Sequence, residues 1–120
     1  MSDMPDPAAV VQRQLEAYNR RDLAALLACY AEDARQYEFP ATLLAQGHAA
    51  IGARMAARFA DPRLHARLRQ RSVMGDLVID HEEITRSAAA GGVERLALVA
   101  IYRVEQGLIR QAVFAFGLAA

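Results

Sequence analysis

Hydrophobic positions in the first twenty residues recur at helical spacing. Val11, Leu15 and Tyr18 fall on one face of a helix in which 3.6 residues complete a turn. Asp6 is a fitting N-cap, because its carboxylate can accept a free backbone N–H, and Pro7 is a fitting first helical residue. The pattern therefore predicts an amphipathic helix that begins at Pro7 and ends at the next polar run.

A second helix and a short strand are predicted before residue 40. The helix, Leu23–Tyr30, follows Asp22 as its N-cap and carries apolar residues at the same spacing. The strand, Ala34–Phe39, stops at Pro40 and places Glu38 between two aromatic residues. If that acid is buried, its charged form is disfavoured, which suits it to proton transfer near neutral pH.

The rest of the chain changes from helical to strand periodicity. A third helix, His48–Phe59, has apolar residues four apart on one stripe. Beyond it the period becomes two, and four strands are predicted near 64–74, 77–87, 94–105 and 108–117. Helices followed by antiparallel strands indicate an α+β fold of order α-α-β-α-β-β-β-β, with the helices packed on one face of the sheet.

The turn at Gly75-Asp76 sets the register of the first predicted hairpin. This register pairs opposite charges across the strands: Arg71 with Asp80, and Arg69 with Glu82. On the other face it pairs Gln70 with His81 and Leu68 with Glu83. We expect the arginines of strand 64–74 to lie toward the rim of a sheet-to-sheet dimer interface, and His81 to lie on the face that the helices cover.

The last two strands are predicted to be apolar on both faces. A three-residue loop before Leu108 pairs Ala100 with Ala112 and Leu98 with Phe114. One face then carries Leu96, Leu98, Ala100, Tyr102, Phe114 and Phe116, and the other carries Ala97, Val99, Ile101, Val113 and Ala115. Because the helices can cover only one face, we expect a homodimer packed sheet to sheet.

Composition narrows the class of protein. The 120 residues, 54% of them hydrophobic, predict a single domain over residues 8–117 and a loosely ordered segment at 1–7. The formal net charge is zero, so we expect neither nucleic acid nor a membrane surface as a partner. Cys29 is the only cysteine, which excludes an intramolecular disulfide and favours a buried thiol in a cytoplasmic protein. The polar N-terminus lacks an apolar signal core.

Several segments resemble the opening and closing of one known superfamily. They are Ala9–Arg13, Tyr18–Leu23, Tyr30–Ala34, Gly47–Ile51 and Ala112–Gly117. Together they resemble the nuclear transport factor 2-like superfamily, close to its SnoaL-like and ketosteroid-isomerase-like branches, over almost the whole domain. The resemblance implies a cone in which three helices pack on a curved, mainly antiparallel sheet and enclose an apolar pocket. The same fold hosts many chemistries, so it does not name a reaction.

The resemblance also implies positions for the site. Ketosteroid isomerases carry a carboxylate base on the first short strand, and an ungapped match places Glu38 there. Their two oxyanion donors correspond to Gln14 and Ala100. Gln14 can donate a hydrogen bond, whereas the side chain of Ala100 cannot, and losing one such donor typically lowers the rate by about 10²–10³-fold. A typical steroid isomerase is therefore not implied.

Each candidate residue has a structural alternative. Glu38 could pair with Arg54 or Arg58, or face solvent, and His81 could be a core histidine satisfied by Gln70. The run Asp80-His81-Glu82 suggests metal ligands, but neighbours on a strand point to opposite faces, so no metal site or cofactor is expected. Tyr18, Tyr102, Phe114 and Phe116 could contact a ligand or simply pack in the core.

Two functions follow from these residues. In the first, a pocket binds a small apolar or cyclic metabolite, with Glu38 and His81 as catalytic groups and with Gln14, Tyr18 and Tyr102 as polar contacts. The reaction would be proton transfer next to a carbonyl, as in isomerases and polyketide cyclases. In the second, the domain binds a ligand or dimerises without catalysis. The discriminating observation is whether Glu38 faces a cavity together with His81 or Gln14.

Overall fold

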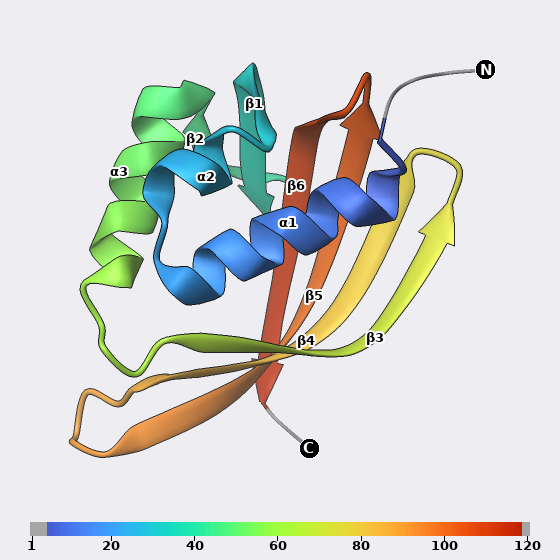
Figure 1. The fold of residues 1–120 in the computed structure, drawn as a ribbon. Helices are drawn as coiled ribbons and strands as arrows, with labels where there is room; N and C mark the ends of the chain where they lie inside the picture. Colours follow the sequence, from blue (N-terminus) through green and yellow to red (C-terminus); the bar gives the residue numbers. More distant parts are fainter. Residues whose placement is uncertain (1–4, 119–120) are drawn as a thin grey trace.

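The computed structural model describes residues 5–118, and it has three helices on one side of a curved six-stranded sheet (Figure 1). The helices are α1 (Pro7–Arg20), α2 (Leu23–Leu27) and α3 (Gly47–Phe59). The strands are β1 (Tyr30–Glu38), β2 (Thr42–Gln46), β3 (His65–Met74), β4 (Leu77–Ser87), β5 (Val93–Glu105) and β6 (Leu108–Leu118). Their order in the sheet is β2-β1-β6-β5-β4-β3, and only β1 and β6 run parallel. The predicted α+β class is confirmed.

The predicted helix starts are confirmed at α1 and α2. The carboxylate of Asp6 accepts the backbone N–H of Ala8 at 3.4 Å, and that of Asp22 accepts the N–H of Ala25 at 3.0 Å. The second helix is shorter than predicted, because Tyr30 starts β1 and is buried. Residues 1–4 of the segment predicted to be loosely ordered lie outside the described residues.

One strand was not predicted from the sequence. Residues 42–46 form β2, which pairs antiparallel with β1 at the edge of the sheet. Four of its five side chains are exposed, so it lacks the alternation of apolar and polar residues that marks a half-buried strand. The strand therefore depends on its pairing with β1, which no local pattern encodes.

The β3–β4 hairpin confirms one predicted charge pair and corrects the other. Arg71 lies opposite Asp80 and forms two hydrogen bonds with its carboxylate, at 2.7 and 2.9 Å. A bulge between Leu68 and Gln70 then shifts the register, so Glu82 lies opposite Leu68 and not opposite Arg69. The predicted pairs of Arg69 with Glu82 and of Leu68 with Glu83 were wrong.

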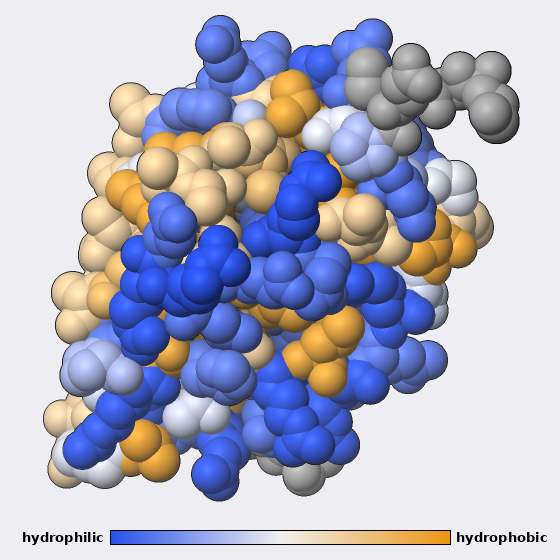
Figure 2. Space-filling view, in the orientation of Figure 1, coloured by the Kyte–Doolittle hydropathy of each residue, from blue (hydrophilic) through white to orange (hydrophobic). Residues whose placement is uncertain are grey.

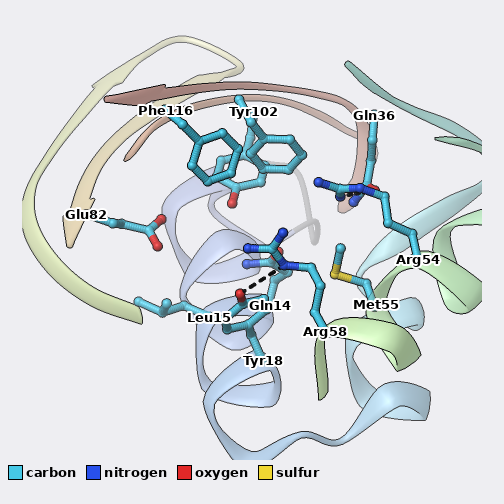
Figure 3. A pocket seen from close by; sticks show the side chains of 11 residues that line it. Gln14, Leu15, Tyr18, Gln36, Arg54, Met55, Arg58, Glu82, Tyr102 and Phe116 are labelled. Carbon is cyan, nitrogen blue, oxygen red and sulfur yellow. Dashed lines mark hydrogen bonds between the residues drawn. The ribbon is translucent and has the colours of Figure 1, made fainter. Parts of the chain in front are cut away.

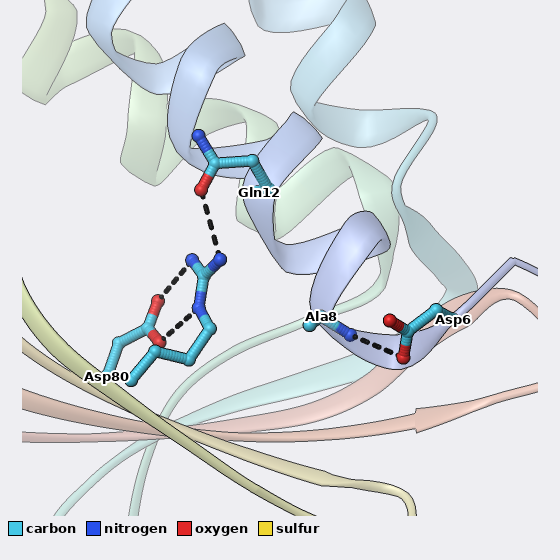
Figure 4. A network of polar contacts seen from close by, with 5 residues as sticks. Asp6, Ala8, Gln12 and Asp80 are labelled. Atoms are coloured by element: carbon cyan, nitrogen blue, oxygen red, sulfur yellow. Dashed lines mark hydrogen bonds and ion pairs between the residues drawn. The ribbon is translucent and has the colours of Figure 1, made fainter.

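The predicted orientation of β4 was also wrong. His81 was expected on the helix-covered face, but it is exposed on the opposite face of the sheet. Asp80 and Glu82 instead point toward the helices and are 0% and 4% exposed. Burial of Asp80 is tolerated because Arg71 neutralises it and donates another hydrogen bond to Gln12 on α1, at 3.0 Å (Figure 4).

The two faces predicted for β5 and β6 are confirmed, although the register differs by two residues. Ala100 lies opposite Phe114, and Leu98 opposite Phe116. One residue of the shift arises because Glu105 pairs with Leu108, so the loop has two residues and not three, and the other arises from a bulge between Arg103 and Val104. A shift of two keeps every side chain on its face. The helix-covered face holds the buried core, which includes Leu98, Ala100, Tyr102, Ala112 and Phe114.

Side chains outside the core divide unevenly over the surface. Hydrophilic residues cover most of the helix-bearing side around α1, whereas moderately hydrophobic residues, in pale orange, gather over α2 and α3 (Figure 2). On the other side of the sheet Val99 is 37% exposed, and no helix of the described residues packs there (Figure 1). Within residues 5–118, no helix is both long and apolar enough to cross a membrane.

Candidate functional site

A small cavity lies between the sheet and helices α1 and α3 (Figure 3). Its volume is about 30 Å³. Since a buried water needs roughly 10–15 Å³, the cavity has room for about two water molecules. The five residues predicted to bind a ligand all line it: Gln14, Tyr18, Tyr102, Phe114 and Phe116. Its other lining residues are Leu15, Gln36, Arg54, Met55, Arg58 and Glu82.

A larger groove adjoins this cavity, because Arg54, Arg58 and Phe116 line both spaces. Its volume is about 480 Å³, which lies in the range of small-molecule sites. The remaining groove residues are Glu38, Leu44, Arg86, Leu96 and Gly117. The cavity is thus the inner end of a site, and the two arginines and Phe116 stand where it meets the groove.

Glu82 is the acidic residue of the cavity. Its side chain extends from β4, the residue is only 4% exposed, and among residues 5–118 only burial and the charges of Asp80 and Arg71 act on the pKa of its carboxylate. Burial, supported by the negative charge of Asp80, raises the pKa of Glu82 from 4.5 to about 7, although Arg71 opposes the shift. Glu82 therefore exchanges a proton near neutral pH.

Asp80 and Arg71 form a fixed ion pair beside Glu82 (Figure 4). Hydrogen bonding to Asp80 is the main cause of a raised pKa of the Arg71 guanidinium, so Arg71 keeps its charge. Because Asp80 uses both oxygens on Arg71, this pair is structural, and Glu82 is the carboxylate left facing the cavity.

A chain of hydrogen bonds crosses the site from α3 to α1. Arg54 donates to Gln36 Oε1 at 2.9 Å, and Gln36 Nε2 donates to the Tyr30 hydroxyl at 3.2 Å. Tyr30 in turn donates to Gln14 Oε1 at 3.1 Å. Each acceptor is used by the preceding donor, so the Nε2 group of Gln14 is the last donor of the chain, and its hydrogen bonding to Tyr102 opposes the rise in the pKa of that phenol.

Tyr102 supplies a neutral hydroxyl to the cavity. Burial is the main cause that raises the pKa of Tyr102, and the charge of Glu82 adds to it. The ring packs edge-on against Phe114 with 6.2 Å between the ring centres. The phenol therefore stays protonated at physiological pH and can donate a hydrogen bond. Ala100, two residues earlier on the same face, is buried and has no donor in its side chain.

The two residues predicted to be catalytic do not share this cavity. Glu38 is exposed and lies in the outer groove, so the burial on which its raised pKa depended is not met, and the alternative that it faces solvent holds. His81 lies on the other face of the sheet. The enzyme hypothesis built on Glu38 and His81 together therefore fails in that form. In residues 5–118, no three His, Cys, Asp or Glu side chains gather closely enough to hold a metal ion.

Sequence reasoning missed Glu82, for which a local signal exists. Asp80 and Glu82 stand between Val78 and Ile84 at alternate positions, and these four side chains are the buried ones of β4. Polar residues interleaved with a buried apolar stripe indicate a polar lining within the core. The predicted pairing of Glu82 with Arg69 concealed this signal.

Three comparisons place the chain among known proteins. A model of the SnoaL-like domain matches residues 11–112. An uncharacterised cystatin fold protein from Novosphingobium aromaticivorans superposes with a TM-score of 0.84 at 22% identity, over 92% of this chain and 97% of that one. IdmH, a proposed polyketide cyclase from Streptomyces antibioticus, superposes with a TM-score of 0.81 at 18% identity, over 93% of this chain and 92% of that one. A hypothetical protein with a ketosteroid isomerase-like fold from Catenulispora acidiphila superposes with a TM-score of 0.79 at 15% identity, over 96% of this chain and 88% of that one. No curated protein matches the chain.

At these identities the solved structures show the fold alone, and they agree with the cone described above. The family model carries the assignment further, because it spans most of the sequence. The chain belongs to the SnoaL-like domain family, within the nuclear transport factor 2-like fold.

Proposed function

We propose that the protein binds a small molecule in the groove and cavity, and that Glu82 moves a proton to or from it. The reaction class is proton transfer next to a carbonyl, as in isomerases and cyclases. The observation that carries the proposal is the position of Glu82, a carboxylic acid that is only 4% exposed and that lines the cavity beside Tyr102 and Gln14. Its pKa of about 7 suits both accepting and returning a proton at neutral pH.

Tyr102 and Gln14 supply the electrostatic part of this proposal. Removal of a proton beside a carbonyl develops negative charge on the carbonyl oxygen, which positioned donors stabilise. The Tyr102 hydroxyl and the Gln14 amide line the same cavity as Glu82. Tyr102 thereby takes the role of the donor that is missing at Ala100.

The dimensions of the two spaces limit how a substrate binds. The cavity admits only about two water molecules, so the body of a metabolite lies in the groove and only its reacting edge enters the cavity. That edge would pass Arg54, Arg58 and Phe116, because these side chains line both spaces.

Deuterium exchange tests the proton transfer. The full chain is incubated with 1-indanone, a small cyclic ketone, in D₂O, and NMR follows exchange of the protons beside the carbonyl. We expect Glu82→Gln to lower the catalysed rate by about 10²–10⁴-fold. Glu83→Gln is the matched control, because Glu83 is the next residue on β4 and forms ion pairs with Arg69 and Arg95 on the other face.

The same assay separates two candidate bases. If Glu38→Gln lowers the rate and Glu82→Gln does not, the base is the one that the family resemblance implied. Because only deprotonated Glu82 acts as a base, the rate is expected to rise with pH through about 7. An unchanged rate in both variants, or no exchange above buffer, would support ligand binding without catalysis.

The outer face of the sheet supports a homodimer. Val99 lies between His81 and Ala115 in the register, and all three side chains point away from the helices. Packing two such faces together would remove exposed apolar surface from water. We expect a dimer by light scattering at micromolar concentration and a monomer for Val99→Glu. A monomeric unmodified protein would contradict this proposal.

A further inference from the structure

We propose that the ligand is an organic acid with one negative charge, whose carboxylate binds between Arg54 and Arg58 while its apolar body lies in the groove. The inference deepens the proposed function by naming the class of substrate. It depends on the proposed binding site and not on the identity of the base. The observations that carry it are the partners of the two guanidinium groups, the charge of the groove and its apolar wall.

The two arginines are one turn apart on α3, and neither is neutralised by the protein. Both are half-buried, and in residues 5–118 no carboxylate lies within 4.0 Å of either guanidinium. Arg54 bonds the neutral oxygen of Gln36 at 2.9 Å, and Arg58 bonds the Tyr18 hydroxyl at 3.4 Å. Burial makes it costly for a charge to lack a partner, and these two partly buried charges have no carboxylate within reach in the described residues, so the arrangement leaves a place for an anion.

Aromatic rings hold both guanidinium groups at the junction of cavity and groove. Arg54 lies 5.4 Å from the centre of the Phe114 ring, and Arg58 lies 5.9 Å from that of Phe116. The two like charges disfavour each other: burial, and next the charge of Arg58, lowers the pKa of Arg54. An anion bound between them would relieve this repulsion. Figure 3 shows Arg58 on the cavity side nearer Glu82 and Arg54 at the far side.

The charges around the groove fit one negative charge on the ligand. Glu38 lines the groove and acts on Arg54 through its charge, yet it forms no ion pair with it in the described residues. Arg86 is already engaged with Glu94 at 2.7 Å. While Glu82 is protonated, below its pKa of about 7, the charges of Arg54 and Arg58 and the negative charge of Glu38 leave one positive charge, which a carboxylate balances and a dianionic phosphate exceeds.

The groove wall accounts for the apolar body. Leu44 and Phe116 are each 37% exposed, and Leu96 lines the same space. Large apolar side chains exposed beside positioned charges are typical of small-molecule sites. An acid whose carboxylate reached the arginines would place its hydrocarbon part against these three residues.

Calorimetry with two probes of equal shape tests the inference. The full chain is titrated near pH 6 with 2-naphthoate and with the neutral 2-naphthamide. We expect the acid to bind at least about 10-fold more tightly than the amide, and Arg54→Gln or Arg58→Gln to weaken only the acid, by about 10–100-fold. Arg35→Gln is the matched control, because Arg35 is exposed on β1 and lines neither space. Glu38→Gln is expected to tighten binding of the acid about 2- to 5-fold.

Three outcomes would overturn the inference. They are equal affinity for acid and amide, unchanged binding of the acid in both arginine variants, and tighter binding of 2-naphthyl phosphate than of 2-naphthoate. The unmodified protein is expected to bind the acid more weakly in high salt. This measurement does not depend on the folding of any variant. Glu82→Gln should bind the acid normally near pH 6, so loss of proton transfer and loss of anion binding are distinguishable.

Discussion

Replacement of Glu82 by glutamine is expected to stabilise the protein above neutral pH and to change its stability little below pH 5. The folded protein raises the pKa of Glu82 from 4.5 to about 7, chiefly by burial. Between these two values the folded chain retains a proton that the unfolded chain has released. The contribution of Glu82 to stability is therefore fully present below 4.5 and is lost as the pH rises through about 7.

The size of the effect follows from the same shift. At about 1.4 kcal/mol per pKa unit, the rise from 4.5 to about 7 corresponds to a loss of about 3 kcal/mol above neutral pH. Glutamine resembles the protonated acid in shape and carries no charge at any pH, so the variant avoids this loss. A difference of that size is a large fraction of the roughly 5–15 kcal/mol that stabilises a typical domain.

Urea denaturation of the unmodified protein and of Glu82→Gln, measured at several pH values between about 5 and 9, gives the difference in unfolding free energy. We expect this difference to grow with pH between about 4.5 and 7, most steeply midway between these values, and to level off above about 7. Glu83→Gln, on the outer face, should show no such trend. A difference that stays constant across the range would refute the assignment of Glu82 as the buried titrating acid of the cavity.

Two further predictions concern the contacts that hold the site in place. Arg71→Gln leaves Asp80 buried without its partner and is expected to destabilise the fold by about 3–5 kcal/mol in urea, whereas Arg69→Gln, which breaks an exposed contact, should change stability by at most about 1 kcal/mol. Equal effects would contradict the structural role of the buried pair. Asn19→Ala removes two hydrogen bonds between α1 and the backbone of Ala66 on β3, at 2.8 and 2.9 Å. We expect a loss of about 1–3 kcal/mol and faster hydrogen exchange at the Ala66 amide; unchanged exchange would show that this anchor contributes nothing.

The fold was predictable where local chemistry decides. Asp6 and Asp22 cap helices as expected, because capping depends on side chains within three residues. The turn at Gly75 placed Arg71 opposite Asp80, because a short turn sets the nearest pairs of a hairpin. Prediction failed beyond the bulges, since an extra residue in one strand arises from packing across the sheet.

The candidate site was predictable only in part. The side chains of Gln14, Tyr18 and Tyr102 line the cavity. Helical and strand periodicities place Tyr18 and Tyr102 on inward faces, and Gln14 was proposed from the family resemblance. Their part in binding a ligand stays a prediction. Glu38 was chosen from its aromatic neighbours and a family resemblance, neither of which reports exposure at the end of a strand. Arg54 and Arg58 were considered only as partners for Glu38.

The sequence by itself determined the helices, the strands after residue 64, the two-faced apolar sheet and the family. Each of these depends on short-range periodicity, capping or motif. Only the tertiary structure decided which face of β4 meets the helices. Alternation divides Asp80, His81 and Glu82 into two sets without saying which set points inward. Arg71 on β3 contacts both Asp80 on β4 and Gln12 on α1, and Val78 and Ile84 are buried on the same face of β4. On that face Glu82 points into the cavity, whereas His81 points away from it.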